Sequence, residues 1–469
     1  MHSHEPVATA DTTAARPVAP LLLAGLAVIP LLVWWAGWYP GILTSDSVDQ
    51  LGQVERFEFF NYHPWFHTFS MWLVTRVWDS AGVVSLAQVL ATGGLFVVVS
   101  RRLIAIGVST RLAIGTVLVV ASLPMVGATT ISLWKDVPFS LAVVWAFAEL
   151  LALARDADRF WSANWPQVRL GAAFALMWLF RHNGMYTVVV VVVVLAIAFR
   201  QRIRDLWKMA ATTVGMAVAM PAILMPALDV EASSIEPAQV FVSDLAASYH
   251  HEPTNFGPDD LELLTAVAPL EVWDQRYSCL DSTPLAFDPE FDETAIKEDP
   301  WSYRWLVIRS VVRDLDTVLG HRVCAASYLV LPSQPDDGFF HRPPFDIAEN
   351  DLGIVRAPLS DRAFDATFAV YRWIEPAGRL WFTWRPALAI WLGIATYLAL
   401  ARRRRLRPLL WPGLLFATHL LNVAATTPAQ EFRFAYPLYL VALLGVPLLS
   451  LATWPERATL APLGAPGRR

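Results

Sequence analysis

The chain has 469 residues, of which 55% are hydrophobic and only 16% are charged. A soluble domain normally carries about 25% charged residues, so the composition excludes an ordinary soluble protein and indicates several membrane-spanning segments. The formal net charge of −5 averages two different regions. Acidic residues gather between Asp229 and Glu375, whereas basic residues cluster in short junctions such as 200–208 and 402–407. Because no basic face accompanies the acidic region, a nucleic-acid partner is not expected.

Ten apolar segments have the length, or nearly the length, of a membrane-spanning helix. We predict spans at residues 18–39, 82–100, 112–130, 137–154, 170–181, 184–199, 209–228, 378–400, 409–425 and 434–452. The polar N-terminus does not resemble a signal peptide, so we interpret the first apolar segment as a retained span. The expected fold class is an all-α polytopic membrane protein with about ten transmembrane helices.

The orientation follows from the basic residues, which favour the cytoplasm when they lie in short loops. With both termini inside a plasma (inner) membrane, every basic cluster faces the cytoplasm, provided that residues 63–78 do not span. That segment contains three Trp, two His and Arg76, a composition that suits a juxtamembrane helix lying in the membrane interface. We therefore predict that it is interfacial, and that the outer loops lie outside the cytoplasm.

This topology divides the chain into five parts. They are a cytoplasmic tail (1–17), an N-terminal transmembrane module (18–228) with its first outer loop (40–81), an extracytoplasmic soluble insert (229–377), C-terminal transmembrane helices (378–452) and a second cytoplasmic tail (453–469). With about 150 residues, the insert can bury a core of its own, of mixed or α structure.

Both cysteines of the chain, Cys279 and Cys324, fall in the insert. Outside the cytoplasm, two thiols in one domain favour a disulfide, and a metal site needs more ligands than this pair offers. The insert also contains aromatic residues that we interpret mainly as core: Trp273, Trp301, Trp305, Phe339 and Phe340.

The first outer loop contains Asp46, a few residues beyond the end of the first span, and Asp49 one helical turn later. A carboxylate just above the bilayer can accept a proton from an acceptor hydroxyl. The local sequence favours a simpler role, in which Ser45 or Asp46 caps a short helix. The two roles are compatible. His63 then opens the juxtamembrane helix, where it either binds a phosphate or simply lies at the interface.

Lys135 and Asp136 lie between the third and fourth spans. The lysine is either an anchor at the membrane surface with a counter-ion or a cation for a phosphate, with Asp136 as a second acid. Arg181, His182 and Asn183 interrupt an otherwise continuous apolar stretch. Such polar residues at membrane depth are costly, so we interpret them as functional.

Arg433 opens the last span among aromatic residues. An isolated arginine on the outer side runs against the positive-inside preference, which favours a functional interpretation. Its guanidinium can hold a phosphate bidentately. The sequence contains no P-loop, nucleotide-binding glycine motif or HExxH motif, so we expect a substrate delivered through the lipid.

Together these motifs resemble those of the GT-C superfamily of polytopic glycosyltransferases, in particular bacterial members related to protein mannosyltransferases and aminoarabinose transferases. The resemblance is carried by SDSVDQ, YHPWFHT, WKDVPF, LFRHNG and EFRFAYP, in that order along the chain. It covers residues 18–200 well and 378–452 loosely, and it does not cover the insert.

The resemblance implies an inverting transfer of a sugar from a polyprenyl-phosphate donor to a hydroxyl of a cell-envelope glycan, lipid or protein. It assigns the catalytic carboxylate to Asp46 and contacts with the donor phosphate to Lys135, Arg181 and Arg433. Secondary contacts to the substrates fall to Asp49, His63, Asp136, His182 and Asn183. Many relatives have an acidic pair where this chain has Asp46 and Ser47, so the second acid is Asp49 or Asp136 and the need for a divalent metal stays open.

Two other classes of function are open. A transporter or flippase of a lipid-linked glycan would keep polar residues at mid-membrane, on broken helices in two related halves. A non-catalytic scaffold would use the acidic insert to bind a partner. The clustering of the polar motifs at one membrane surface favours the transferase.

Overall fold

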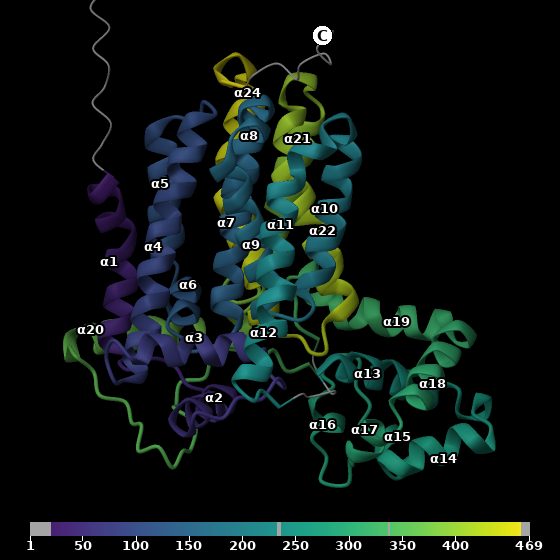
Figure 1. Ribbon diagram of the computed structural model, residues 1–469. Helices are drawn as coiled ribbons and strands as arrows, with labels where there is room; N and C mark the ends of the chain where they lie inside the picture. The colour runs from purple at the N-terminus through teal and green to yellow at the C-terminus, as the bar shows by residue number, and fades with distance from the viewer. Residues whose placement is uncertain (1–19, 232–235, 336–337, 461–469) are drawn as a thin grey trace, which may run out of the picture.

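The computed structural model describes residues 20–231, 236–335 and 338–460. The predicted N-terminal tail (1–17) and residues 461–469 of the predicted C-terminal tail lie outside these ranges. Within the described residues the regular structure is helical, and β-structure is limited to isolated bridges. The molecule consists of a helical bundle, three helices across the foot of that bundle, and a group of short helices beside the foot (Figure 1).

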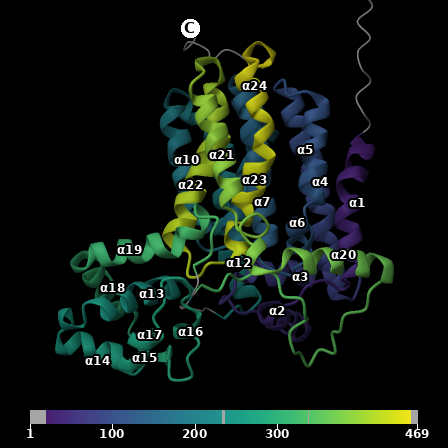
Figure 2. The ribbon, with the colours of Figure 1, turned by 180° about the vertical axis from the view of Figure 1, so that it is seen from behind.

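The bundle helices stand side by side along one direction (Figures 1 and 2). They are α1(Pro20–Gly37), α4(Ala81–Ala105), α5(Thr110–Ser122), α7(Asp136–Arg155), α9(Asn164–Phe180), α10(Gly184–Ala198), α11(Trp207–Val214), α12(Met220–Ala227), α21(Ala387–Ala401), α22(Leu410–Thr426), α23(Phe432–Gly445) and α24(Leu449–Thr453), with the small helix α8(Ala157–Ser162) at the far end.

Five helical segments of this bundle are long and apolar enough to cross a membrane. They are Ala81–Ala105, Asp136–Arg155, Arg200–Ala227, Arg404–Thr426 and Phe432–Thr453, and the bent pair α5 and α6(Pro124–Thr130) makes a sixth if it is one span. The apolar segments Leu26–Gly37, Gly184–Ala198 and Ala387–Ala401 are shorter. The chain is thus an all-α membrane protein.

Helix α7 forms the centre of the bundle, where it contacts α4, α9, α22 and α23. The carboxylate of its buried Glu149 binds Arg102 of α4 at 3.1 Å and Arg169 of α9 at 2.9 Å. A buried carboxylate is tolerated only when it is paired, so this cluster fixes three helices together at the end far from Asp136. The first residue of α7, Asp136, is fully buried at the opposite end.

Two predicted spans differ from the observed helices. The predicted span 112–130 is bent by 65° between α5 and α6, because Pro124 cannot continue the helical hydrogen bonding and restricts the residue before it. The predicted span 378–400 begins as a regular helix only at Ala387. There the buried Arg385 donates hydrogen bonds to the carbonyl of Leu331, and Pro386 follows directly.

Three helices lie across the foot of the bundle rather than along it: α2(Ser45–Arg56), α3(Trp65–Thr75) and α20(Asp361–Ile374) (Figures 1 and 2). With 11 residues, α3 is about 16 Å long, too short to cross a bilayer core of about 30 Å. Its orientation agrees with the predicted interfacial segment 63–78. Helix α20 packs against α1, away from the short helices of the insert.

The short helices beside the foot are α13(Glu236–His251), α14(Pro258–Val267), α15(Leu270–Gln275), α16(Thr283–Ala286), α17(Thr294–Glu298), α18(Pro300–Arg313) and α19(Leu315–Ala325). Helices α13 to α18 share a hydrophobic core that includes Leu264, Trp273 and Leu306. The expectation that most aromatic residues of the insert are core is wrong: Trp273 and Phe340 are buried, but Trp301, Trp305 and Phe339 are exposed. Their aromatic character alone does not distinguish a core position from a second, outward-facing apolar surface.

Candidate functional site

A cavity of about 1470 Å³ opens where the foot of the bundle meets the insert. Its wall is built by the start of α2, the segment before α7, the turn between α9 and α10, helices α13 and α22, and the segment that leads into α23. Of the nine residues predicted as catalytic or substrate-binding, seven line this cavity: Asp46, His63, Lys135, Arg181, His182, Asn183 and Arg433.

Asp46 reaches the cavity because the start of α2 is tied to the segment before α7. The backbone of Ile42 exchanges hydrogen bonds with Ile131 and Leu133, at 3.1 and 3.0 Å. Ser47 donates to the carbonyl of Leu133 at 3.0 Å. These bonds bring the second residue of α2 next to Lys135.

The prediction that Ser45 or Asp46 caps α2 is wrong, because the cap lies one or two residues earlier. Thr44, in extended backbone, is the N-cap, and its hydroxyl accepts a hydrogen bond of 3.0 Å from the indole of Trp134. Neither Ser45 nor Asp46 caps the helix. The Asp46 carboxylate points instead to the guanidinium of Arg433, with Oδ2 and Nη1 2.9 Å apart. The capping hydroxyl is thus bound by Trp134, 90 positions from Thr44 in the sequence, and local sequence does not contain that information.

Arg433 joins two carboxylates. Its Nε lies 2.6 Å from Oε2 of the buried Glu431, while Nη1 holds Asp46. His63 Nε2 lies 3.9 Å from the other oxygen of Asp46, and His63 Nδ1 lies 2.8 Å from the ammonium of Lys135. Five titratable groups thus form one connected network on the cavity wall.

The network controls the protonation of Asp46. Burial on its own would raise the pKa of Asp46, but the positive charges of Arg433, His63 and Lys135 outweigh burial and lower the pKa to about 2. Asp46 is therefore ionised at neutral pH. About a third of its side chain is accessible, on the side that faces the cavity.

Arg181 forms the other cationic part of the wall. Its guanidinium is paired with the buried carboxylate of Asp136, and its Nε donates to Asn183 at 3.2 Å. The ring of Phe434 lies close to both arginines: its centroid is 4.8 Å from Cζ of Arg181 and 5.2 Å from Cζ of Arg433. Cation–π contacts of this kind stabilise both guanidiniums beside one ring.

The turn that presents Arg181, His182 and Asn183 is fixed against its neighbours. Asn183 donates to Thr426 at 3.0 Å, and Asn422 of α22 donates to the carbonyl of Asn183 at 2.9 Å. Gly184 follows because a Cβ at this position would collide with the carbonyl oxygen of Met177. The sequence LFRHNG is thus a tight packing element as well as a source of polar side chains.

Two predicted residues do not line the cavity. Asp136 is fully buried behind Arg181, so it acts through that arginine. Asp49 accepts a hydrogen bond of 2.8 Å from Gln53 on its own helix and is not among the residues that line the cavity.

Glu431 was missed by the sequence reasoning, although EFRFAYP contains it two residues before Arg433. A carboxylate so close to a functional arginine was a usable signal. Also missed were two ion pairs from the insert: His341 with Asp281 at 2.8 Å, and Arg322 with Asp244 at 2.7 Å. His341, Arg322 and Asp244 line the cavity. No local pattern points to these four residues, because they meet only through the tertiary fold.

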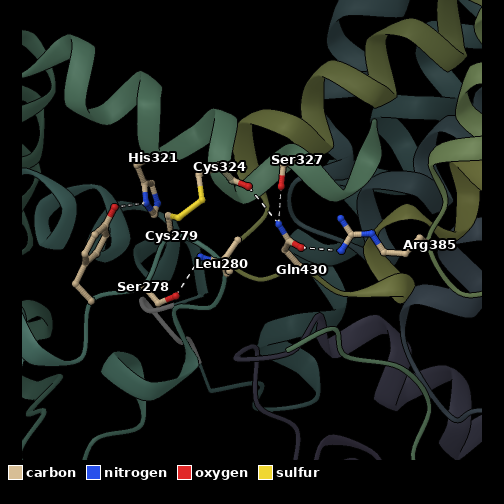
Figure 3. Close-up of a disulfide and its surroundings, with 9 residues drawn as sticks. Ser278, Cys279, Leu280, His321, Cys324, Ser327, Arg385 and Gln430 are labelled. Atoms are coloured by element: carbon tan, nitrogen blue, oxygen red, sulfur yellow. Dashed lines mark hydrogen bonds between the residues drawn. A yellow bond between two sulfur atoms is a disulfide. The ribbon is translucent and has the colours of Figure 1, made fainter. Parts of the chain in front are cut away.

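The insert determines where Glu431 and Arg433 lie. The backbone of 428–432 is bonded on one side to Leu280 and Ser282, and on the other side to His341, at distances of 2.9 to 3.0 Å. The Gln430 side chain donates to Ser327 at 2.8 Å and accepts from Arg385 at 3.1 Å (Figure 3). The segment that enters α23 is therefore clamped between parts of the insert and the start of α21.

A disulfide between Cys279 and Cys324 lies beside this clamp (Figure 3). It joins the 280–282 segment to α19, and the carbonyl of Cys324 accepts a hydrogen bond of 3.2 Å from Gln430. Among the described residues, no group of three or more His, Cys, Asp or Glu side chains is arranged to hold a metal ion.

Replacing both cysteines by serine should destabilise the insert and loosen the clamp. The two cysteines are 45 residues apart, for which the loss of the cross-link costs about 4 kcal/mol on the chain-entropy model. We expect a lower thermal midpoint in detergent, and the same lowering when a reductant is added to the parent protein. Reductant should not affect the double-serine variant. An unchanged midpoint in both experiments would show that the clamp does not need the disulfide.

Comparisons with known proteins give one family and two solved structures. No curated protein matches the sequence significantly. The protein O-mannosyltransferase complex Pmt1-Pmt2 of S. cerevisiae, solved with its sugar donor, matches at 17% identity and a TM-score of 0.35, over 45% of this chain and 33% of that chain. This chain thus spans a third of that relative. ArnT from Cupriavidus metallidurans, solved with undecaprenyl phosphate, matches at 13% identity and a TM-score of 0.37, over 92% of this chain and 78% of that chain.

The family model that matches is described as a family of unknown function, DUF6020, and it matches residues 60–307. Because that match covers more than half of the 469 residues, the chain belongs to the family of unknown function DUF6020.

Proposed function

We propose that the protein is an inverting membrane glycosyltransferase, which moves a sugar from a polyprenyl-phosphate donor to an acceptor hydroxyl outside the cytoplasm. The observation that supports this proposal best is the meeting of Asp46 with Lys135, Arg181 and Arg433 on the wall of one cavity. A carboxylate and several cations around one space are what the transfer requires, because a proton must be removed and a phosphate must leave.

The donor phosphate would bind among the three cations. Lys135 lies at the His63 end of the network, and the two arginines lie on either side of Phe434. The same cavity is lined by apolar side chains of α10 and α22, including Met185, Val190 and the exposed Leu421. An apolar carrier chain would therefore reach the phosphate site from the lipid along these two helices.

The charges around the phosphate site have to be balanced. The three cations face three carboxylates, those of Asp46, Asp136 and Glu431. When all six groups are ionised, they have no excess positive charge for a phosphate. Burial raises the pKa of Glu431, although the charges of Arg433 and His341 oppose this effect. A protonated Glu431 would leave one net positive charge, which the donor phosphodiester would neutralise.

In the transfer step, the acceptor oxygen would form a bond to the anomeric carbon while the bond from that carbon to the phosphate oxygen breaks. The bonding electrons would leave with the polyprenyl phosphate, and the acceptor proton would move to Asp46. A carboxylate with a pKa of about 2 is a weak base while Arg433 holds it. When a phosphate shares Arg433, the ion pair weakens and Asp46 becomes more basic, so donor binding would prepare the base.

The acceptor would enter from the insert side of the cavity. There the exposed rings of Phe241, Phe287 and Phe339 stand near the pairs His341–Asp281 and Arg322–Asp244. Aromatic faces beside charged hydrogen-bonding groups suit an acceptor that carries hydroxyl groups, such as a cell-envelope glycan. These charge pairs come from the insert, so the insert would supply the polar groups that bind the acceptor.

We further propose the predicted topology for this enzyme: ten spans in a plasma (inner) membrane, cytoplasmic termini, and an outer compartment that contains the cavity and residues 229–377. Cysteine replacements provide the test. In intact cells, a membrane-impermeant thiol reagent should label Glu262→Cys in the insert and fail to label Arg404→Cys, which lies at the other end of the bundle. The reverse labelling pattern would place the cavity in the cytoplasm.

Asp46→Asn should abolish transfer from a labelled polyprenyl-phosphate sugar, with a loss of about 10²-fold or more, because an amide cannot accept the proton. Asp49→Asn is the matched control, since this residue is on the same helix but outside the cavity lining. The control should keep most of the activity and the parent's thermal midpoint. Asp46→Asn removes a charged partner of Arg433 and should lower the midpoint, so the activity of each variant is measured well below its own midpoint. Near-normal turnover by Asp46→Asn would contradict the role of Asp46 as the base. Movement of the donor across vesicles without transfer would indicate a flippase instead.

Glu431→Gln should change how donor binding depends on pH. In the parent protein, affinity for the donor should weaken as pH rises, because Glu431 loses its proton and its negative charge then repels the phosphate. Glutamine resembles the protonated acid, so the variant should bind the donor with an affinity that changes much less over the same range. The measurement is a titration of donor binding at a series of pH values. A parallel dependence in both proteins would contradict the role of Glu431.

A further inference from the structure

Helices α18 and α19 of the insert expose a stripe of large apolar side chains. On each helix the positions are spaced by three or four residues, which places them on one face. The seven residues are Trp301, Trp305, Ile308, Val312, Leu315, Leu319 and Val323, with exposed fractions from 48% to 74%. We call this surface the α18–α19 face.

The insert does not need this face for its own core. Tyr303 and Leu306 of α18 are buried on the opposite side, as is Val318 of α19. Helix α13 packs against both helices, and it lies farther from the bundle than α19 does (Figures 1 and 2). The exposed side of α19 is therefore not the side covered by α13.

The α18–α19 face continues into the apolar surface of the bundle. Helix α19 runs outward from the foot, across the direction of the bundle helices (Figures 1 and 2). After it, Val330 and Leu331 are exposed, and the carbonyl of Val330 accepts a hydrogen bond of 2.9 Å from the indole of Trp391 on α21. Trp391 is itself half exposed, and Leu392 and Leu398 continue the exposed apolar surface along α21.

We propose that the α18–α19 face is seated in the surface of the lipid bilayer, at the boundary between headgroups and acyl chains. Its chemistry fits that boundary: two tryptophans lie in the stripe, and Arg304 lies beside it, with its Cζ 5.1 Å from the ring centroid of Trp301. The neighbouring Arg309 and Arg313 are instead paired within the insert, with Asp260 and Asp314. Helices with an apolar face that contains Trp, bordered by basic residues, lie in the interface plane. Continuity with the apolar surface of α21 favours lipid over a second protein as the occupant.

Contact of the α18–α19 face with the bilayer would hold one wall of the cavity at the membrane surface. Arg322 of α19 lines the cavity, binds Asp244 and donates to the carbonyl of Val240 at 2.6 Å. Cys324, directly after the stripe residue Val323, forms the disulfide with Cys279, next to the 280–282 segment of the clamp. The inference is independent of the chemistry proposed for the cavity, because it concerns only where α18 and α19 lie.

The test is the depth of nitroxide labels in the full chain, reconstituted in nanodiscs of phosphatidylethanolamine and phosphatidylglycerol. Labels would be attached to Val312→Cys and Leu319→Cys without reductant, so that the disulfide stays closed. Leu398→Cys on α21 is the lipid-exposed reference, and Glu262→Cys on α14 is the water-exposed reference. Both test labels should be relaxed more by oxygen, which dissolves in lipid, than by a water-soluble nickel complex, as at Leu398.

Two outcomes would overturn the proposal. Labels at Val312 and Leu319 that respond to nickel as Glu262 does would put the α18–α19 face in water. Labels shielded from both oxygen and nickel would show that protein covers it, either a second copy or another chain. Loss of donor transfer is not a readout here, so a failure of the proposed enzyme activity would leave this experiment unaffected.

Discussion

The site depends on one arginine held between two carboxylates. Arg433 binds Asp46, 387 residues away in the sequence, and Glu431, two residues away. Charges removed from water are tolerated when they are paired, and breaking such a pair by removing one partner typically costs about 3–5 kcal/mol. The segment between α1 and α4 and the last long helix of the chain are therefore held together at the cavity, and the remaining elements of the site are arranged around that link.

Contacts from both the insert and the bundle position Arg433 and Asp46 for this ion pair. The segment 428–431 precedes α23 and lies outside the helices, and backbone hydrogen bonds join it and Phe432 to residues of the insert on both sides. Asp46 is positioned from the other direction, through the bonds between the start of α2 and the segment before α7. A displacement of the insert would consequently move Arg433 relative to Asp46, although neither residue belongs to the insert.

The sequence was informative where one physical rule dominates. Length and apolar composition predict membrane-spanning helices, and the all-α membrane class is confirmed. The distribution of basic residues predicted that Asp46, Lys135, Arg181 and Arg433 share one side, and all four line one cavity. Their roles in transfer are still proposals.

Sequence reasoning failed where tertiary contacts decide between local options. Thr44 rather than Ser45 or Asp46 caps α2, because Trp134 bonds to the threonine hydroxyl. The pairs His341–Asp281 and Arg322–Asp244 join segments far apart in the chain, and no regular spacing of residues in the sequence indicates such pairs. Trp301 and Trp305 look like core residues in sequence because a helix with apolar residues on two faces has the same composition as a buried one.

The arginines of the cavity are neutralised by carboxylates of the chain itself. Arg181 is paired with Asp136, and Arg433 is held between Asp46 and Glu431. A partly buried cation without a partner is costly, so this pairing stabilises the site. Under the proposed function, a donor phosphate would have to compete with a carboxylate for Arg433. Asp46, which is accessible on the cavity side, is the carboxylate that such an exchange would release.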